Sequence, residues 1–127
     1  MGKKTLSVAF IFGTMAVALG AFGAHALKEM VDEKAIQTYQ TGVQYHFYHV
    51  FALVITGLLL NGHPLIWYKR AAALFTVGIF IFCGSLYAMT FFKAAGFTNM
   101  NWLGAITPIG GSFFIAGWLC LFMGVRK

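Results

Sequence analysis

Charged residues are scarce in this sequence, and acidic residues are scarcer still. Charged residues fill 9% of the 127 positions, with nine lysines and arginines but only three acids, whereas 60% of the residues are apolar. A soluble domain of this length needs polar side chains over about half of its helical surface. The composition therefore excludes a soluble domain and indicates an integral membrane protein.

Cysteine is nearly absent as well, and the two that occur argue against a disulfide. Cys83 and Cys120 fall in successive apolar segments, which would cross a membrane in opposite directions. Cys83 is then expected in the outer half of the membrane and Cys120 nearer the cytoplasm. Because a disulfide needs Cα atoms within about 7 Å of each other, we interpret both cysteines as small packing residues.

What the sequence has in abundance is long apolar segments. They cover residues 6–24, 43–60, 71–92 and 106–125. Each is close to the ~20 residues that a helix needs to cross ~30 Å of hydrocarbon. The sequence therefore predicts an all-α, polytopic membrane protein, with one four-transmembrane-helix bundle over residues 1–127. The predicted spans cover about 5–25, 42–61, 70–92 and 104–125.

The ends of the second helix have their own signals. Asp32 and Glu33 suit the start of a helix, where negative charge is favourable, so we expect the helix to begin there, before its membrane segment. The stretch 61–64, Asn-Gly-His-Pro, is a turn signal that ends the helix.

The basic residues are unevenly divided between the two sides of such a bundle. Six of them lie at the termini and the second connection, on one side: Lys3, Lys4, Lys69, Arg70, Arg126 and Lys127. The other side has three lysines, balanced by all three acids. The positive-inside rule predicts a plasma (inner) membrane protein with both termini in the cytoplasm and connections 24–42 and 93–103 outside. Since the charge reports topology, it does not indicate a nucleic-acid partner.

The N-terminal segment has a second interpretation, as a cleaved signal peptide. Lys3 and Lys4 precede an apolar stretch that ends in Ala-His-Ala at 24–26, the pattern of a signal-peptidase site. The stretch is about 19 residues long, whereas the apolar region of a typical signal has about 7–15. Cleavage would also leave only three helices, so we favour a retained helix.

Small residues form one stripe along the first helix at spacings of three and four. The stripe consists of Ala9, Gly13, Ala16, Gly20 and Gly23. Lipid tails are as apolar as leucine, so helices in a membrane associate largely through close contact between small residues. The stripe is therefore predicted to be the helix-packing surface on which a neighbouring helix lies.

Hydrogen-bonding residues gather in the predicted outer half of the bundle. They include His25, Tyr45, His49, Ser85, Tyr87 and Thr107. A histidine that faces hydrocarbon leaves its ring N–H unpaired at a cost of several kcal/mol. We therefore expect His25 and His49 to turn inward and to form a polar cluster with Tyr45 and either Ser85 or Tyr87.

Four stretches of the chain match a known pattern in order. They read GAFGAHALK (20–28), GVQYHFYH (42–49), FCGSLY (82–87), and ITPIGG with the later AGW (106–111 and 116–118). Over its whole length the chain resembles the small bacterial inner-membrane family called domain of unknown function 423, related to eukaryotic transmembrane protein 256. The resemblance implies a four-helix membrane fold and brings no established activity. All six residues of the polar set have counterparts in that pattern, but His46 stands where the family usually has glutamine.

Three classes of function fit these residues. The first is a small binding or transport-accessory module with an outward polar pocket, although no Asp, Glu, Lys or Arg in mid-membrane supports a proton- or cation-coupled carrier. The second is a structural or assembly protein whose histidines only clasp helices. The third is a haem- or metal-binding protein that uses His25 with His46 or His49. No carboxylate or thiolate lies nearby to complete such a site, so we expect no cofactor.

The remaining expectations concern catalysis and partners. An enzyme is disfavoured because no nucleophile–base pair and no carboxylate pair is present. Membrane lipid is the expected partner, and a homo-oligomer or an unidentified membrane partner stays open.

Overall fold

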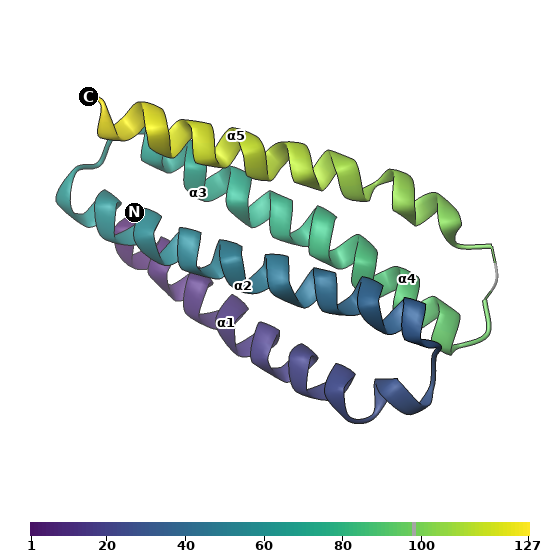
Figure 1. Cartoon of the computed structure of the whole chain (residues 1–127). Helices are drawn as coiled ribbons and strands as arrows, with labels where there is room; N and C mark the ends of the chain where they lie inside the picture. The colour runs from purple at the N-terminus through teal and green to yellow at the C-terminus, as the bar shows by residue number, and fades with distance from the viewer. Residues whose placement is uncertain (98) are drawn as a thin grey trace.

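The structure is a computed structural model that describes residues 1–97 and 99–127 (Figure 1). Its elements are α1 (Gly2–Ala24), η1 (Leu27–Glu29), α2 (Glu33–Gly62), α3 (Ile66–Gly78), η2 (Ile79–Cys83), α4 (Gly84–Ala94), η3 (Asn101–Ala105) and α5 (Thr107–Val125). The elements η1 and η3 are 3₁₀ helices. The π-helical segment η2 joins α3 to α4 in one continuous rod.

Within the described part of the chain, four helical segments are long and apolar enough to cross a membrane. They are Gly2–Glu29, Glu33–Gly62, Ile66–Ala94 and Asn101–Val125. This confirms the predicted all-α fold with four transmembrane helices. All four segments begin before the predicted spans, because helix geometry continues beyond the apolar run: by three residues at Gly2 and Asn101, by four at Ile66 and by nine at Glu33. The start at Glu33 is the one that the acids Asp32 and Glu33 predict.

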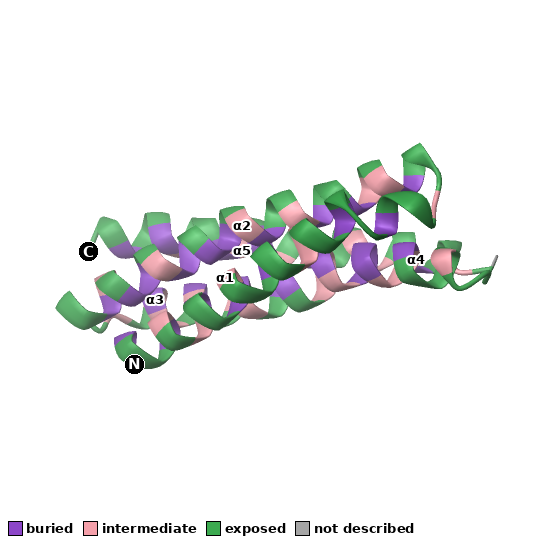
Figure 2. Cartoon of the chain, turned by 90° about the horizontal axis from the view of Figure 1, so that it is seen from below, coloured by how far each residue is buried: buried purple, intermediate pink, exposed green. Residues whose placement is uncertain are grey.

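The four rods lie side by side, and Figure 1 shows both termini at the same end of the bundle. We call this the terminal end; the connection from α2 to α3 lies there too. The opposite end, which we call the loop end, holds η1, the end of α4 and the start of η3. The rod α1 packs along α2, α3 packs along α5, and α2 also contacts α3 and α4. Figure 2 shows exposed positions along the outer sides of the rods, as expected where apolar side chains face lipid.

The second helix begins and ends where the sequence predicts. Asp32 is the N-cap of α2, and its carboxylate accepts a hydrogen bond of 2.9 Å from the backbone N–H of Ala35. The helix ends at Gly62, and the chain turns through His63 and Pro64 into α3. A capping aspartate satisfies one of the N–H groups that a helix start leaves unpaired.

The third rod contains a feature that the sequence analysis missed. In η2 the helix widens to the π pattern, and the N–H of Gly84 donates to the carbonyl of Ile79, five residues earlier. The backbone of α5 passes very close to this segment at Gly110: a Cβ on that glycine would lie 2.7 Å from the Cα of Phe82. At the π segment the third and fourth membrane rods are thus in direct backbone contact, with no room for a side chain at Gly110.

The small-residue stripe of α1 lies against α2. Its two alanines are fully buried: Ala9 and Ala16. A Cβ added at Gly13 would meet Val50 of α2 at 3.5 Å, and one added at Gly20 would meet Val43 at 3.4 Å. A methyl group would therefore fit at either glycine in ordinary contact, and the closest packing of the stripe on α2 lies at the buried alanines.

The stripe ends in its tightest contact, at Gly23. The ring of Tyr39 fills the space that a side chain at Gly23 would need, with Cδ1 2.7 Å from the position of an added Cβ. Tyr39 is fully buried, and its hydroxyl donates a hydrogen bond to the carbonyl of Leu19. This tyrosine fixes the start of α2 against the end of α1.

Candidate functional site

His49 lies inside an aromatic cluster between α2, α3 and α5. Only 4% of it is exposed, and its ring stacks on Phe114 with a centroid distance of 3.5 Å and an interplanar angle of 8°. Its Nδ1 is 2.7 Å from the carbonyl of Tyr45, and the indole N–H of Trp118 donates to Nε2 at 3.1 Å. A carbonyl only accepts, so Nδ1 carries the proton and Nε2 accepts. Both ring nitrogens of His49 are thus paired, and neither is free to bind a metal.

His46 forms a second buried contact, between α2 and α4. It is 2% exposed, and its Nδ1 lies 2.9 Å from the hydroxyl of Tyr87. Its Nε2 has no hydrogen-bond partner among the described residues. The pair joins two helices, and the ring edge packs on Phe12 of a third.

Ser85 and Thr107 form the third polar contact, between α4 and the start of α5. Their hydroxyl oxygens are 2.6 Å apart. The Ser85 hydroxyl also lies 2.8 Å from the Phe82 carbonyl in the π segment. This contact connects the third and fourth membrane rods just beyond the close approach at Gly110.

His25 is not part of any of these contacts, and the prediction that it turns inward is wrong. It is the C-cap of α1, and its side chain is exposed with no hydrogen bond in the described part of the chain. The physical reason is the turn into η1, which buries Leu27 completely at the position where we expected the histidine. The turn thus buries Leu27, two residues further on, and leaves His25 exposed.

The structure therefore replaces the single predicted cluster by three separate pairs. His49 pairs with Trp118, His46 with Tyr87, and Ser85 with Thr107. Tyr45 contributes its backbone carbonyl and a ring nearly parallel to that of His49, with 6.1 Å between centroids.

Trp118 and His46 were missing from the predicted polar set, which did include Tyr87, the partner of His46. The one signal for Trp118 was its place in the AGW stretch of the family pattern.

The candidate metal ligands do not form a ligand set. In residues 1–97 and 99–127, no group of three or more His, Cys, Asp or Glu side chains is placed to hold a metal ion. The three histidines have different surroundings. His25 is exposed, His46 has one ring nitrogen in a hydrogen bond, and His49 has both. Nothing in these surroundings favours the haem or metal alternative.

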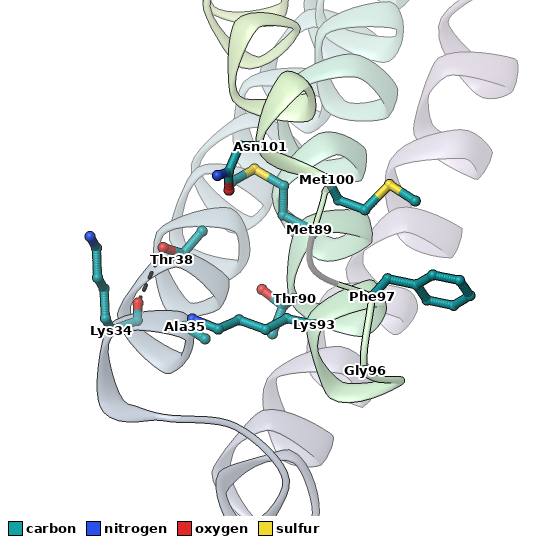
Figure 3. Close-up of a pocket in the computed structure, with 10 residues that line it drawn as sticks. All are labelled: Lys34, Ala35, Thr38, Met89, Thr90, Lys93, Gly96, Phe97, Met100 and Asn101. Atoms are coloured by element: carbon teal, nitrogen blue, oxygen red, sulfur yellow. Dashed lines mark hydrogen bonds between the residues drawn. The ribbon is translucent and has the colours of Figure 1, made fainter.

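A cavity of about 490 Å³ lies at the loop end, between α2, α4 and the connection to η3 (Figure 3). It is lined by Lys34, Ala35, Thr38, Met89, Thr90, Lys93, Gly96, Phe97, Met100 and Asn101. Apolar walls are thus combined with two lysines and with hydroxyl and amide groups. No pattern in the sequence predicts this cavity, because it depends on how far α2 and α4 stand apart at their ends.

One lysine of the cavity is paired with an acid beside it. The ammonium of Lys93 lies 3.0 Å from Oδ2 of Asp32, and Figure 3 shows its side chain crossing from α4 toward α2. The same carboxylate caps α2. The hydrogen bond from the N–H of Ala35 has the largest effect on the pKa of Asp32, and the ammonium of Lys93 the next largest. Together they hold this pKa below its usual range. The carboxylate is therefore charged at neutral pH and connects the two helix ends.

Comparisons with known proteins agree on one family. A family model described as protein of unknown function (DUF423) matches residues 19–111. The UPF0382 membrane protein YwdK of Bacillus subtilis is 40% identical over 98% of this chain and 98% of its own. A UPF0382 membrane protein of Haemophilus influenzae is 34% identical over 100% of this chain and 97% of its own. The UPF0382 inner membrane protein YgdD of Escherichia coli is 31% identical over 96% of this chain and 88% of its own. No solved structure matches the chain.

Proposed function

The chain belongs to the DUF423 family of proteins of unknown function, and we propose that it is a small ligand-binding or transport-accessory module of the membrane. It is an integral membrane protein, as its relatives are named. The observation that supports a binding role is the cavity at the loop end. The buried polar pairs do not support one, because their members bond to each other inside the bundle.

The size and walls of the cavity suit an amphiphilic molecule. Its volume of about 490 Å³ lies within the range of about 300–1,000 Å³ that is common for small-molecule sites. Ala35 and Met89 offer apolar contact, whereas Thr38 and Asn101 offer hydrogen bonds. At the end of a membrane bundle, hydrocarbon gives way to head groups, so a ligand with an apolar and a polar part would meet both kinds of wall.

A structural role is the second candidate, and the three buried pairs favour it. Each pair connects two different membrane rods. Hydrogen bonds between membrane helices contribute about 0.6–2 kcal/mol each, so three of them stabilise the bundle noticeably. These three contacts account for the buried pairs without a ligand, with the Nε2 of His46 as the one buried side-chain atom left without a partner among the described residues. They are compatible with binding at the loop end.

Filling the cavity tests the binding role. Thr38→Trp would place an indole between α2 and α4, and it should lower ligand occupancy several-fold. The protein is reconstituted in vesicles that contain a photoactivatable phosphatidylcholine or phosphatidylglycerol, and labelling of the peptides with residues 34–38 and 89–101 is measured. The wild-type protein should be labelled there by at least one of the two probes.

The matched control is Thr41→Trp, one turn further along α2. Both hydroxyls bond back to a carbonyl four residues earlier, but Thr41 is exposed and does not line the cavity. The control should keep wild-type labelling at the cavity. If both variants lowered it equally, or if neither probe labelled these peptides in the wild-type protein, the binding role would be wrong.

We also propose that the protein lies in the inner membrane with both termini in the cytoplasm, on the strength of the unequal division of basic residues. A cysteine placed at Val31, near the loop end, should then react with a membrane-impermeant maleimide added to intact spheroplasts. The two native cysteines are replaced by alanine as background. Reaction only in inverted vesicles would reverse the orientation.

A further inference from the structure

We infer that the cavity at the loop end takes an anionic lipid of the bilayer, and that Asp32 competes with the lipid head group for Lys93. The inference rests on the binding function proposed above and names the chemistry of its ligand. It follows from three observations: the charge of the cavity lining, the apolar part of its walls, and the geometry of the Asp32–Lys93 pair.

The charge of the lining favours an anion. Its ten residues include two lysines and no acid. Lys34 makes no ion pair with any residue in the described ranges, and Lys93 is paired only with Asp32, outside the lining. Phosphate oxygens of a head group are strong acceptors for lysine, and basic residues beside a membrane helix attract anionic lipid.

The apolar walls favour a lipid over a free anion. Ala35 of α2 and Met89 of α4 are apolar, so hydrocarbon contacts are available from both helices that border the cavity. A small inorganic anion would leave these walls unused. A lipid would set its head group at the lysines and extend its chains along the walls toward the hydrocarbon.

The Asp32–Lys93 pair is weak enough to exchange. Both side chains are more than half exposed, at 60% for Asp32 and 51% for Lys93. Exposed ion pairs contribute little to stability because water and salt screen them. A head group that also meets Lys34 can therefore take over the Lys93 ammonium and leave Asp32 with its capping bond to Ala35.

The two tasks of Asp32 can be separated by one substitution. Asp32→Asn removes the charge, but asparagine caps helices about as well as aspartate. The variant should fold like the wild-type protein and lose only the carboxylate that competes for Lys93. Lys93→Gln removes the cation itself and should have the opposite effect on lipid binding.

The experiment compares two photoactivatable lipids with the same acyl chains, phosphatidylglycerol and phosphatidylcholine, each at trace level in phosphatidylcholine vesicles. In the full-length wild-type protein, phosphatidylglycerol should label the peptides with residues 34–38 and 89–101 more strongly. Asp32→Asn should raise this labelling about two- to fivefold, the effect of removing one exposed ion-pair partner. Lys93→Gln should lower it by a similar factor. Labelling by phosphatidylcholine should not change in either variant.

The control is Glu29→Gln, which removes an acid at the same end that makes no ion pair in the described part of the chain. It should leave the phosphatidylglycerol labelling unchanged. An increase equal to that of Asp32→Asn would indicate general surface charge and overturn the inference. So would loss of labelling in excess inorganic phosphate, which would identify a free anion as the ligand. Equal labelling by both lipids would refute anion selectivity and leave the binding role standing, whereas labelling by neither would refute the binding role itself.

Discussion

Replacing Gly110 by alanine is expected to lower the free energy of unfolding by about 1–3 kcal/mol, the usual effect of overfilling a well-packed interior. An added Cβ would lie 2.7 Å from the Cα of Phe82. Because the obstacle is backbone in η2, no side-chain rotation relieves it, and α5 must move away from the third rod. The separation would also lengthen the nearby contact between Ser85 and Thr107. Unfolding in mixed micelles, followed by circular dichroism, measures the change.

The next residue provides the control. At Gly111 the closest atom to an added Cβ is 3.8 Å away, an ordinary van der Waals distance. Alanine is preferred over glycine inside a helix by about 1 kcal/mol, so Gly111→Ala should leave stability unchanged or raise it. If the two variants were equally stable, the backbone contact between α5 and η2 would not contribute to packing.

The fold could be predicted from the sequence because its main determinants are local. Four apolar runs of membrane length specify four helices, and Asp32 marks the start of α2 by its own capping bond. The π segment η2 could not be predicted in this way. It accompanies a contact between Gly110 and Phe82, which are far apart in the chain. Only the packed bundle shows that glycine at 110 is required there.

The contacts between the buried polar residues were predicted less well. The sequence indicates how deep in the membrane each side chain lies, but not the direction in which it points from its helix. Each residue advances a helix by about 1.5 Å along its axis, so side chains of matching depth can be identified. Which faces meet depends on how each rod turns about its axis. His46 and Tyr87 meet between α2 and α4, whereas His49 turns toward Trp118 of α5.

Replacing His49 by alanine is expected to lower the free energy of unfolding by about 3–5 kcal/mol, comparable with the loss of a buried aromatic side chain. The substitution removes the ring that stacks on Phe114 and leaves a cavity among aromatic neighbours. It also removes the acceptor of the Trp118 N–H, which then has no partner in an apolar environment. Both losses have the same sign, so stability should depend much more on His49 than on the exposed His25.

His25→Ala is the matched control. It makes the same substitution, histidine to alanine, at an exposed position instead of a buried one. Its side chain is exposed, and the buried Leu27 holds the end of α1 in its place. Substitutions at exposed positions without specific contacts usually change stability by less than about 0.5 kcal/mol, and we expect no more here. Thermal and denaturant unfolding of both variants in the same micelles compares them directly. A loss at His25→Ala as large as that at His49→Ala would mean that His25 reaches the buried polar groups after all, and that the single cluster expected from the sequence is the correct arrangement.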